Sequence, residues 1–158
     1  MSDRPEIFMQ EAIRLAEDGM RSKRGGPFGC VVVRQGKIIA RGNNRVTSTN
    51  DPTAHAEITA IRDACRELGT FQLGDCELYT SCEPCPMCLA AIYWARIPQV
   101  FYANTRADAA AIGFDDDFIY QQIPLPPDQR TIKMQPLLRD VARQTFEAWK
   151  NMPDKIGY

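Results

Sequence analysis

Three of the six cysteines lie within the short segment Cys82–Cys88, and this cluster constrains the fold more than any other feature of the chain. Cys85 and Cys88 are three residues apart and follow Pro84, a residue favoured in the first turn of a helix. Side chains three apart lie on one face of a helix, and the positive end of the helix dipole favours thiolates. The spacing therefore predicts a pair of metal-binding thiolates at a helix start, not a disulfide.

The only histidine of the chain, His55, completes a candidate zinc site. It lies in the first turn of a helix predicted to begin after Thr53, a plausible N-cap. One imidazole and two thiolates form a three-ligand zinc site that leaves a fourth position for an activated water. Glu57 follows two residues later and could exchange protons with that water as a general acid and base. A lone histidine is more often structural, but this one accompanies a cysteine pair.

Cys82 offers an alternative interpretation of the same residues. It precedes Cys85 by three positions and could act as a fourth ligand, which would close the site. Zinc would then only stabilise the fold, and Glu57 would have no role. Against this, Cys82 ends a predicted strand and the following Glu83-Pro84 pair turns away from it.

The rest of the chain alternates between helical and extended patterns. Apolar residues at helical spacing predict a first helix, and a β-branched run and a turn at Gln35-Gly36 then predict a hairpin. The predicted helices cover 5–21, 54–68, 84–95, 106–111 and 137–150, and the predicted strands cover 28–33, 37–40, 76–80 and 99–103. The segments 42–52 and 113–120 are expected to be loops. This order predicts an α/β domain with a mixed sheet covered by helices.

Composition limits the classes of protein to consider. A chain of 158 residues with 44% hydrophobic residues suits a single domain, 1–158. Its 19 basic and 20 acidic residues leave a net charge of −1, which disfavours duplex DNA or long RNA as a partner. The apolar runs are too short to cross a membrane, and the first residues do not resemble a signal peptide. We therefore expect a cytoplasmic protein with no membrane partner and reduced cysteines.

The segments DPTAHAE (51–57) and SCEPCPMC (81–88) resemble the cytidine deaminase superfamily, and the resemblance covers nearly the whole chain. The H-x-E and P-C-x-x-C patterns match a known signature of zinc-dependent deaminases. The resemblance implies a three-layer α/β/α fold around a five-stranded mixed sheet. It also implies one zinc ion per subunit on His55, Cys85 and Cys88, with Glu57 as a catalytic residue.

Flanking segments narrow the resemblance to the bacterial guanine deaminases of this superfamily. Ser81-Cys82 stand where tRNA-editing relatives commonly have Thr-Leu, and CLAAIYWAR, GFDDDFIY and the segment 149–158 look like guanine deaminases. The implied reaction is the hydrolysis of guanine to xanthine and ammonia, as in purine catabolism or salvage. The implied partner is thus a small purine base.

This resemblance implies roles for four further residues, each with a simpler alternative. Asn44 would read the purine, or shape a turn. Phe28 would pack on the base, or belong to the core. Asp116 would be a second catalytic residue that moves protons, or part of a solvated acidic loop. Tyr158 would hydrogen-bond the base, or be a disordered end.

The resemblance further implies a homodimer in which residues 137–158 are exchanged between subunits, with the proline-rich segment 124–127 as a hinge. Tyr158 would then complete the pocket of the partner. Two alternatives to the implied activity stay open. One is a deaminase of guanosine or of another nucleobase or nucleoside, including adenosine in tRNA. The other is a structural zinc module without catalytic activity.

Overall fold

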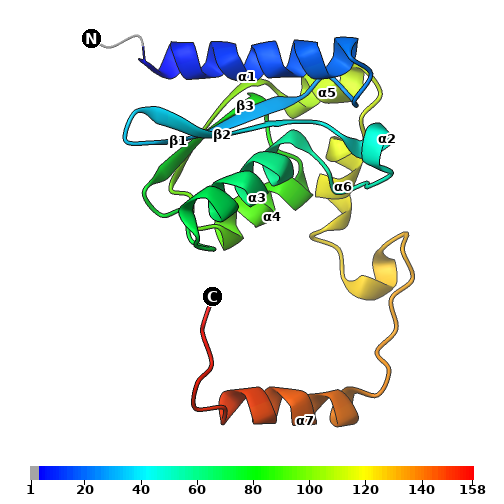
Figure 1. Cartoon of the computed structure of the whole chain (residues 1–158). Coiled ribbons are helices and arrows are strands. Elements are labelled where there is room, and N and C mark those ends of the chain that lie inside the picture. The colour runs from blue at the N-terminus through cyan, green and yellow to red at the C-terminus, as the bar shows by residue number, and fades with distance from the viewer. Residues whose placement is uncertain (1–3) are drawn as a thin grey trace. The chain divides into compact units, whose positions relative to one another are not determined.

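The computed structural model describes residues 4–158, which form two compact units (Figure 1). The first unit runs to Ile119 and contains the sheet, and the second covers Tyr120–Tyr158. None of the helices in the described part of the chain is both long and apolar enough to cross a membrane.

The first unit is built on a mixed sheet with the strand order β2-β1-β3-β4. Strand β1 pairs antiparallel with both β2 and β3, whereas β3 and β4 are parallel. The strands are β1 (Gly29–Arg34), β2 (Lys37–Asn43), β3 (Cys76–Cys82) and β4 (Gln99–Asn104). The α/β class is confirmed, but the predicted number of strands is wrong: residues 4–158 form four strands and not five. After β4 the chain continues into helices, which leaves β4 at the edge of the sheet.

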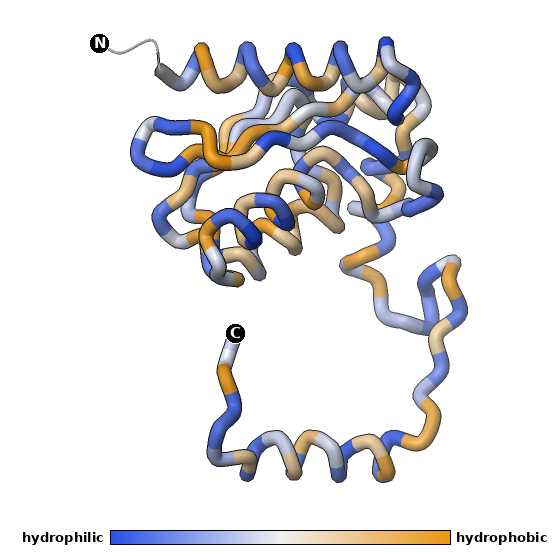
Figure 2. Tube along the Cα trace, viewed as in Figure 1, coloured by the Kyte–Doolittle hydropathy of each residue, from blue (hydrophilic) through white to orange (hydrophobic). Residues whose placement is uncertain are grey.

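Helices cover both faces of this sheet (Figure 1). Helix α1 (Arg4–Arg21) lies on one face, where Phe8 packs with Val31 and Tyr79. Helices α3 (Ala56–Leu68) and α4 (Pro86–Trp94) lie on the other face, over the core that contains Val32 and Leu78. Successive side chains of a strand point to opposite faces, so the apolar run Cys30–Val33 makes β1 apolar on both sides. Figure 2 colours the chain by hydropathy.

Close packing of α3 against the sheet depends on a glycine. A Cβ atom on Gly42 of β2 would lie 2.2 Å from the carbonyl oxygen of Ala56, in the first turn of α3. Any larger residue would push the start of α3 away from the sheet, and the neighbouring histidine would move with it.

Both helix starts that were predicted to carry zinc ligands are shifted by two residues. Helix α3 has His55 as its N-cap residue, not Thr53. Oδ1 of Asp51 accepts from both the backbone N–H and the hydroxyl of Thr53, which holds Thr53 in the turn before the helix. Helix α4 has Cys85 as its N-cap and begins at Pro86, not at Pro84. His55 and Cys85 thus occupy the cap positions themselves, and Cys88 lies in the first turn of α4.

The segment 113–120 was expected to be a loop, but α6 (Asp116–Gln122) begins within it. The aspartates at 116 and 117 lie in the first turn of that helix, where negative charge is favourable. The short helix α2 (Val46–Thr49) likewise lies in a predicted loop. Helix α5 (Arg106–Ala111) matches its prediction.

The second unit contains a short 3-10 helix, Pro127–Gln129, and one longer helix, α7 (Arg139–Lys150). Apolar side chains of α7 are exposed, with Phe146 at 78% and Trp149 at 46% of full exposure. The exchange of 137–158 between subunits involves a second chain and stays a prediction.

Candidate active site

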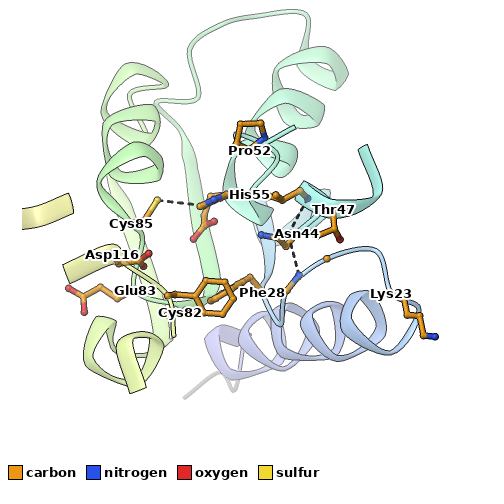
Figure 3. Close-up of a pocket in the computed structure, with 15 residues that line it drawn as sticks. Lys23, Phe28, Asn44, Thr47, Pro52, His55, Cys82, Glu83, Cys85 and Asp116 are labelled. Atoms are coloured by element: carbon orange, nitrogen blue, oxygen red, sulfur yellow. Dashed lines mark hydrogen bonds between the residues drawn. The ribbon is translucent and has the colours of Figure 1, made fainter. Parts of the chain in front are cut away.

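Two helix starts bring the three predicted metal ligands together. The Nδ1 atom of His55 lies 3.5 Å from the sulfur of Cys85 and 3.5 Å from the sulfur of Cys88. All three ligand atoms lie within 4.8 Å of one another. Figure 3 shows His55 and Cys85 facing each other across the end of the cavity. The geometry is that of a group able to hold one metal ion.

The donor set of this group suits zinc. Imidazole nitrogen and thiolate sulfur are common zinc ligands, and three protein ligands leave a coordination position open. His55 and Cys85 both line the cavity, so the open side can be reached from solvent. Cys82 does not join the group: its thiol donates to the backbone oxygen of Thr105 at 3.7 Å. Among residues 4–158, the group therefore lacks the fourth protein ligand that a closed, structural site needs.

The two cysteine thiols of this group differ in acidity. Contact with Cys88, with a smaller contribution from His55, lowers the pKa of Cys85. The same contact, together with burial, raises the pKa of Cys88. The hydrogen bond with Cys85 also raises the pKa of His55.

Glu57 lies beside the ligands and is only 6% exposed. Its Oε1 atom accepts a hydrogen bond from the hydroxyl of Thr80 at 2.9 Å, and its Oε2 atom accepts one from the thiol of Cys88 at 3.4 Å. Burial raises the pKa of the Glu57 carboxyl group. A buried carboxylate at the edge of a metal group can exchange protons there without being a ligand.

His55, Cys85 and Glu57 line a cavity of about 530 Å³. Its volume falls within the range of small-molecule sites. Asn44, Lys23, Thr47 and Pro52 are among the residues that line it (Figure 3).

The Asn44 side chain both shapes a loop and faces this cavity. Its Oδ1 atom accepts from the backbone N–H groups of Gly26 and Val46, each at 3.2 Å. These two bonds occupy the carbonyl oxygen, so the amide NH₂ group is the part that can donate to a ligand. The two alternatives for Asn44, a turn and a ligand contact, are therefore compatible.

Two aromatic rings form one wall of the cavity. Phe28 and Phe114 meet edge to face, with ring centroids 4.8 Å apart. A Cβ atom on Gly26 would lie 3.2 Å from both rings, so a side chain at this position would crowd them. Asp116, at the start of α6, is half-buried in the same cavity, and burial raises the pKa of its carboxyl group. The wall suits a flat ring, and Asp116 faces the space beside it.

Seven of the eight residues singled out from the sequence belong to this one region, namely Phe28, Asn44, His55, Glu57, Cys85, Cys88 and Asp116. Tyr158 belongs to the second unit and is 73% exposed. Sequence reasoning missed Thr80 and Phe114. Phe114 precedes the three aspartates and could have been singled out as an aromatic residue beside an acidic cluster, but nothing in the pattern of the β3 segment marks Thr80 as a partner of Glu57.

One known family and several known proteins are similar to this chain. The cytidine and deoxycytidylate deaminase zinc-binding region matches residues 2–104. The guanine deaminase of Bacillus subtilis (strain 168) is 55% identical over 153 residues, which cover 97% of this chain and 98% of that protein. The tRNA-specific adenosine deaminase of Aquifex aeolicus (strain VF5) is 43% identical over 98 residues, which cover 62% of this chain and 64% of that protein.

Solved structures of guanine deaminases are also similar to this chain. The X-ray structure of guanine deaminase from Bacillus subtilis has a TM-score of 0.94 and covers 97% of this chain and 98% of that one. Guanine deaminase from Nitrosomonas europaea is 34% identical, with a TM-score of 0.69, and covers 91% of this chain and 83% of that one. The likeness to guanine deaminases therefore extends beyond the zinc-binding region into the second unit.

Proposed function

Because the chain belongs to the cytidine and deoxycytidylate deaminase family, we propose that its zinc site carries out the hydrolysis of guanine to xanthine and ammonia. The observation that carries this proposal is the 55% identity to a guanine deaminase over 97% of the chain. The tRNA-specific adenosine deaminase of Aquifex aeolicus matches only 62% of the chain, and the net charge of −1 does not favour a polyanionic substrate. Guanine is thus the substrate and zinc the cofactor.

The ligands His55, Cys85 and Cys88 would hold the zinc ion at the starts of α3 and α4. Zinc bound at such a site acidifies a coordinated water and makes a nucleophile available at neutral pH. Glu57 is the group positioned to accept the proton of the attacking water and to deliver it to ring atom N3 while C2 is attacked. The balanced reaction is guanine plus water giving xanthine plus ammonia, with the C2–N bond broken and a C2–O bond formed.

Three cavity residues would bind the base and assist the departure of ammonia. Phe28 supplies an aromatic surface against which the purine ring can pack. The amide NH₂ group of Asn44, whose carbonyl oxygen is already occupied, donates a hydrogen bond to an acceptor on the ring edge. Asp116, half-buried in the same cavity, exchanges protons with the leaving amino group together with Glu57. These roles are supported by the common location of the residues.

The role of Asn44 can be tested with a substitution that keeps its loop contacts. In Asn44→Asp a carboxylate oxygen still accepts from Gly26 and Val46, but the NH₂ donor is lost. A lost hydrogen bond of about 1.4 kcal/mol corresponds to a factor of about ten in affinity, so we expect kcat/KM for guanine to fall by about tenfold or more. Because Asn44 is only 5% exposed, the melting temperature is measured alongside to report the cost of the buried carboxylate, and kcat/KM is compared where both proteins are folded. An unchanged kcat/KM would leave Asn44 with only its loop role.

We further propose that the active protein is a homodimer in which residues 137–158 are exchanged, so that Tyr158 completes the partner's pocket. Strand β4 is an edge strand, and Tyr102 on it is 51% exposed. The apolar side chains of α7 are exposed as well, and a second copy of the chain would cover them. An exchanged segment would bury apolar surface, and both β4 and α7 have exposed apolar side chains that it could bury.

A mixing experiment tests the exchange. Chains with Glu57→Gln and chains with Tyr158→Ala are co-expressed with different tags, and the hybrid dimers are purified. With exchange, one of the two pockets of a hybrid receives an intact Glu57 and an intact Tyr158 from different chains, and activity rises above the average of the two parent proteins. Without exchange, neither pocket is complete, and activity stays at that average. A monomeric wild-type protein would also contradict the proposal.

A comparison of substrates separates guanine from the alternatives. We expect kcat/KM for guanine to exceed that for guanosine, cytosine and adenosine, and tRNA adenosine to remain unmodified. Faster turnover of guanosine or of tRNA adenosine would keep the zinc chemistry and overturn the substrate assignment. The cytoplasmic location remains our proposal from the sequence.

A further inference from the structure

A buried hydrogen bond links the proposed proton carrier to the central strand of the sheet. The hydroxyl of Thr80 donates to Oε1 of Glu57 at 2.9 Å, and Thr80 is only 1% exposed. Thr80 lies on β3, which pairs with β1 on one side and with β4 on the other. Alternation along the strand turns it to the same face as Leu78 and Cys82, toward α3. On this largely apolar face, the side chain of Thr80 hydrogen-bonds Glu57.

The other side-chain contact of Glu57 cannot serve the same purpose once metal is bound. The Cys88 thiol donates to Oε2 of Glu57 at 3.4 Å. A cysteine binds metal as a thiolate, which carries no proton to donate. The Thr80 hydroxyl keeps its proton, and β3 fixes its position through strand pairing on both sides. Thr80 is therefore the side-chain donor that persists at Glu57 in the zinc-loaded protein.

We propose that Thr80 is a positioning residue that orients the Glu57 carboxylate toward the reacting atoms. The inference rests on the proposed role of Glu57 as proton carrier. Without the hydroxyl, Oε1 of Glu57 loses a buried partner, and the carboxylate can rotate away from its working position. Hydrogen-bond partners that orient groups at metal sites typically contribute about 10–100-fold to activity or metal affinity.

Two substitutions separate the hydroxyl of Thr80 from its packing. Thr80→Val removes the hydroxyl and keeps the branched shape, whereas Thr80→Ser keeps the hydroxyl and removes a methyl group. We expect Thr80→Val to lower kcat for guanine by about 10–100-fold, with KM and zinc content unchanged. Thr80→Ser should recover most of that kcat although its melting temperature falls. A kcat that follows the melting temperature in both variants would overturn the inference.

A double substitution shows whether Thr80 acts through Glu57. In a Glu57→Gln background, Thr80→Val should cause no further fall in kcat, and a further tenfold fall would overturn the inference. If Glu57→Gln itself keeps its turnover, the proposed role of Glu57 fails. If Glu57→Gln loses turnover and Thr80→Val does not, only the role of Thr80 fails.

A crystal structure supplies a readout that does not depend on turnover. In zinc-loaded Thr80→Val we expect the Glu57 carboxylate to have rotated from its wild-type position while the ligands His55, Cys85 and Cys88 stay in place. An unmoved carboxylate would contradict the inference. Should Thr80→Val not fold, Thr80→Ala carries the same expectations, since it also lacks the hydroxyl and does not overfill the site.

Discussion

Glu57→Gln lowers kcat for guanine by about 10²–10⁴-fold in our account, the range typical of a lost general acid and base. The glutamine side chain has nearly the same shape and still offers an oxygen to the Thr80 hydroxyl, which now donates to Glu57 at 2.9 Å. It cannot accept and return a proton. Because Glu57 is not one of the three ligands, zinc content should stay at one per chain. The measurement is steady-state turnover with metal analysis of the same sample.

Glu67→Gln is the matched control for this change. Glu67 lies on the same helix α3 but in its last turn, and it is exposed to solvent. Its substitution should leave turnover and zinc content at wild-type levels. Turnover of Glu57→Gln within tenfold of the wild type would contradict the role of Glu57. A simultaneous loss of zinc would assign Glu57 to the metal site instead.

Loss of a zinc ligand should have the largest effect on activity. Cys88 is fully buried and its sulfur is 3.5 Å from Nδ1 of His55, so Cys88→Ala removes a ligand that no other described residue is placed to replace. We expect zinc to fall well below one per chain and turnover to fall below detection. We expect this large loss of turnover because zinc lowers the pKa of a bound water from 15.7 to about 7.

Cys82→Ser is the control that tests the alternative of a closed, structural site. The sulfur of Cys82 contacts the backbone oxygen of Thr105 and lies outside the ligand group. Elemental analysis should therefore find one zinc per chain in Cys82→Ser and little in Cys88→Ala. Loss of zinc from Cys82→Ser as well would identify Cys82 as a ligand. That result would favour a structural zinc module over a catalytic site.

Local sequence patterns predicted the metal group because each ligand is tied to a helix start. A proline before Cys85 and a run of helical periodicity after His55 were sufficient to place both starts to within two residues. The error of two residues has a physical cause. Thr53 has the residue type of an N-cap, but Asp51 binds both its backbone N–H and its hydroxyl in a turn before the helix, and His55 is the N-cap residue.

Contacts between distant segments could not be predicted in the same way. Thr80 and Glu57 are 23 residues apart and meet only because β3 passes beneath α3 in the folded sheet. The fifth strand was implied by the family resemblance and not by a hydrophobic pattern of this chain, and residues 4–158 do not form it. Helix α6 was mistaken for a loop because its acidic first turn was interpreted as solvated charge and not as a helix start.

The most direct test is to measure the products that the zinc-loaded wild-type protein forms from guanine. Chromatography measures xanthine, and a separate assay measures ammonia. We expect equal amounts of xanthine and ammonia, with both products lost when Glu57 is replaced by glutamine. A zinc-loaded protein that forms no xanthine from guanine would contradict the central claim.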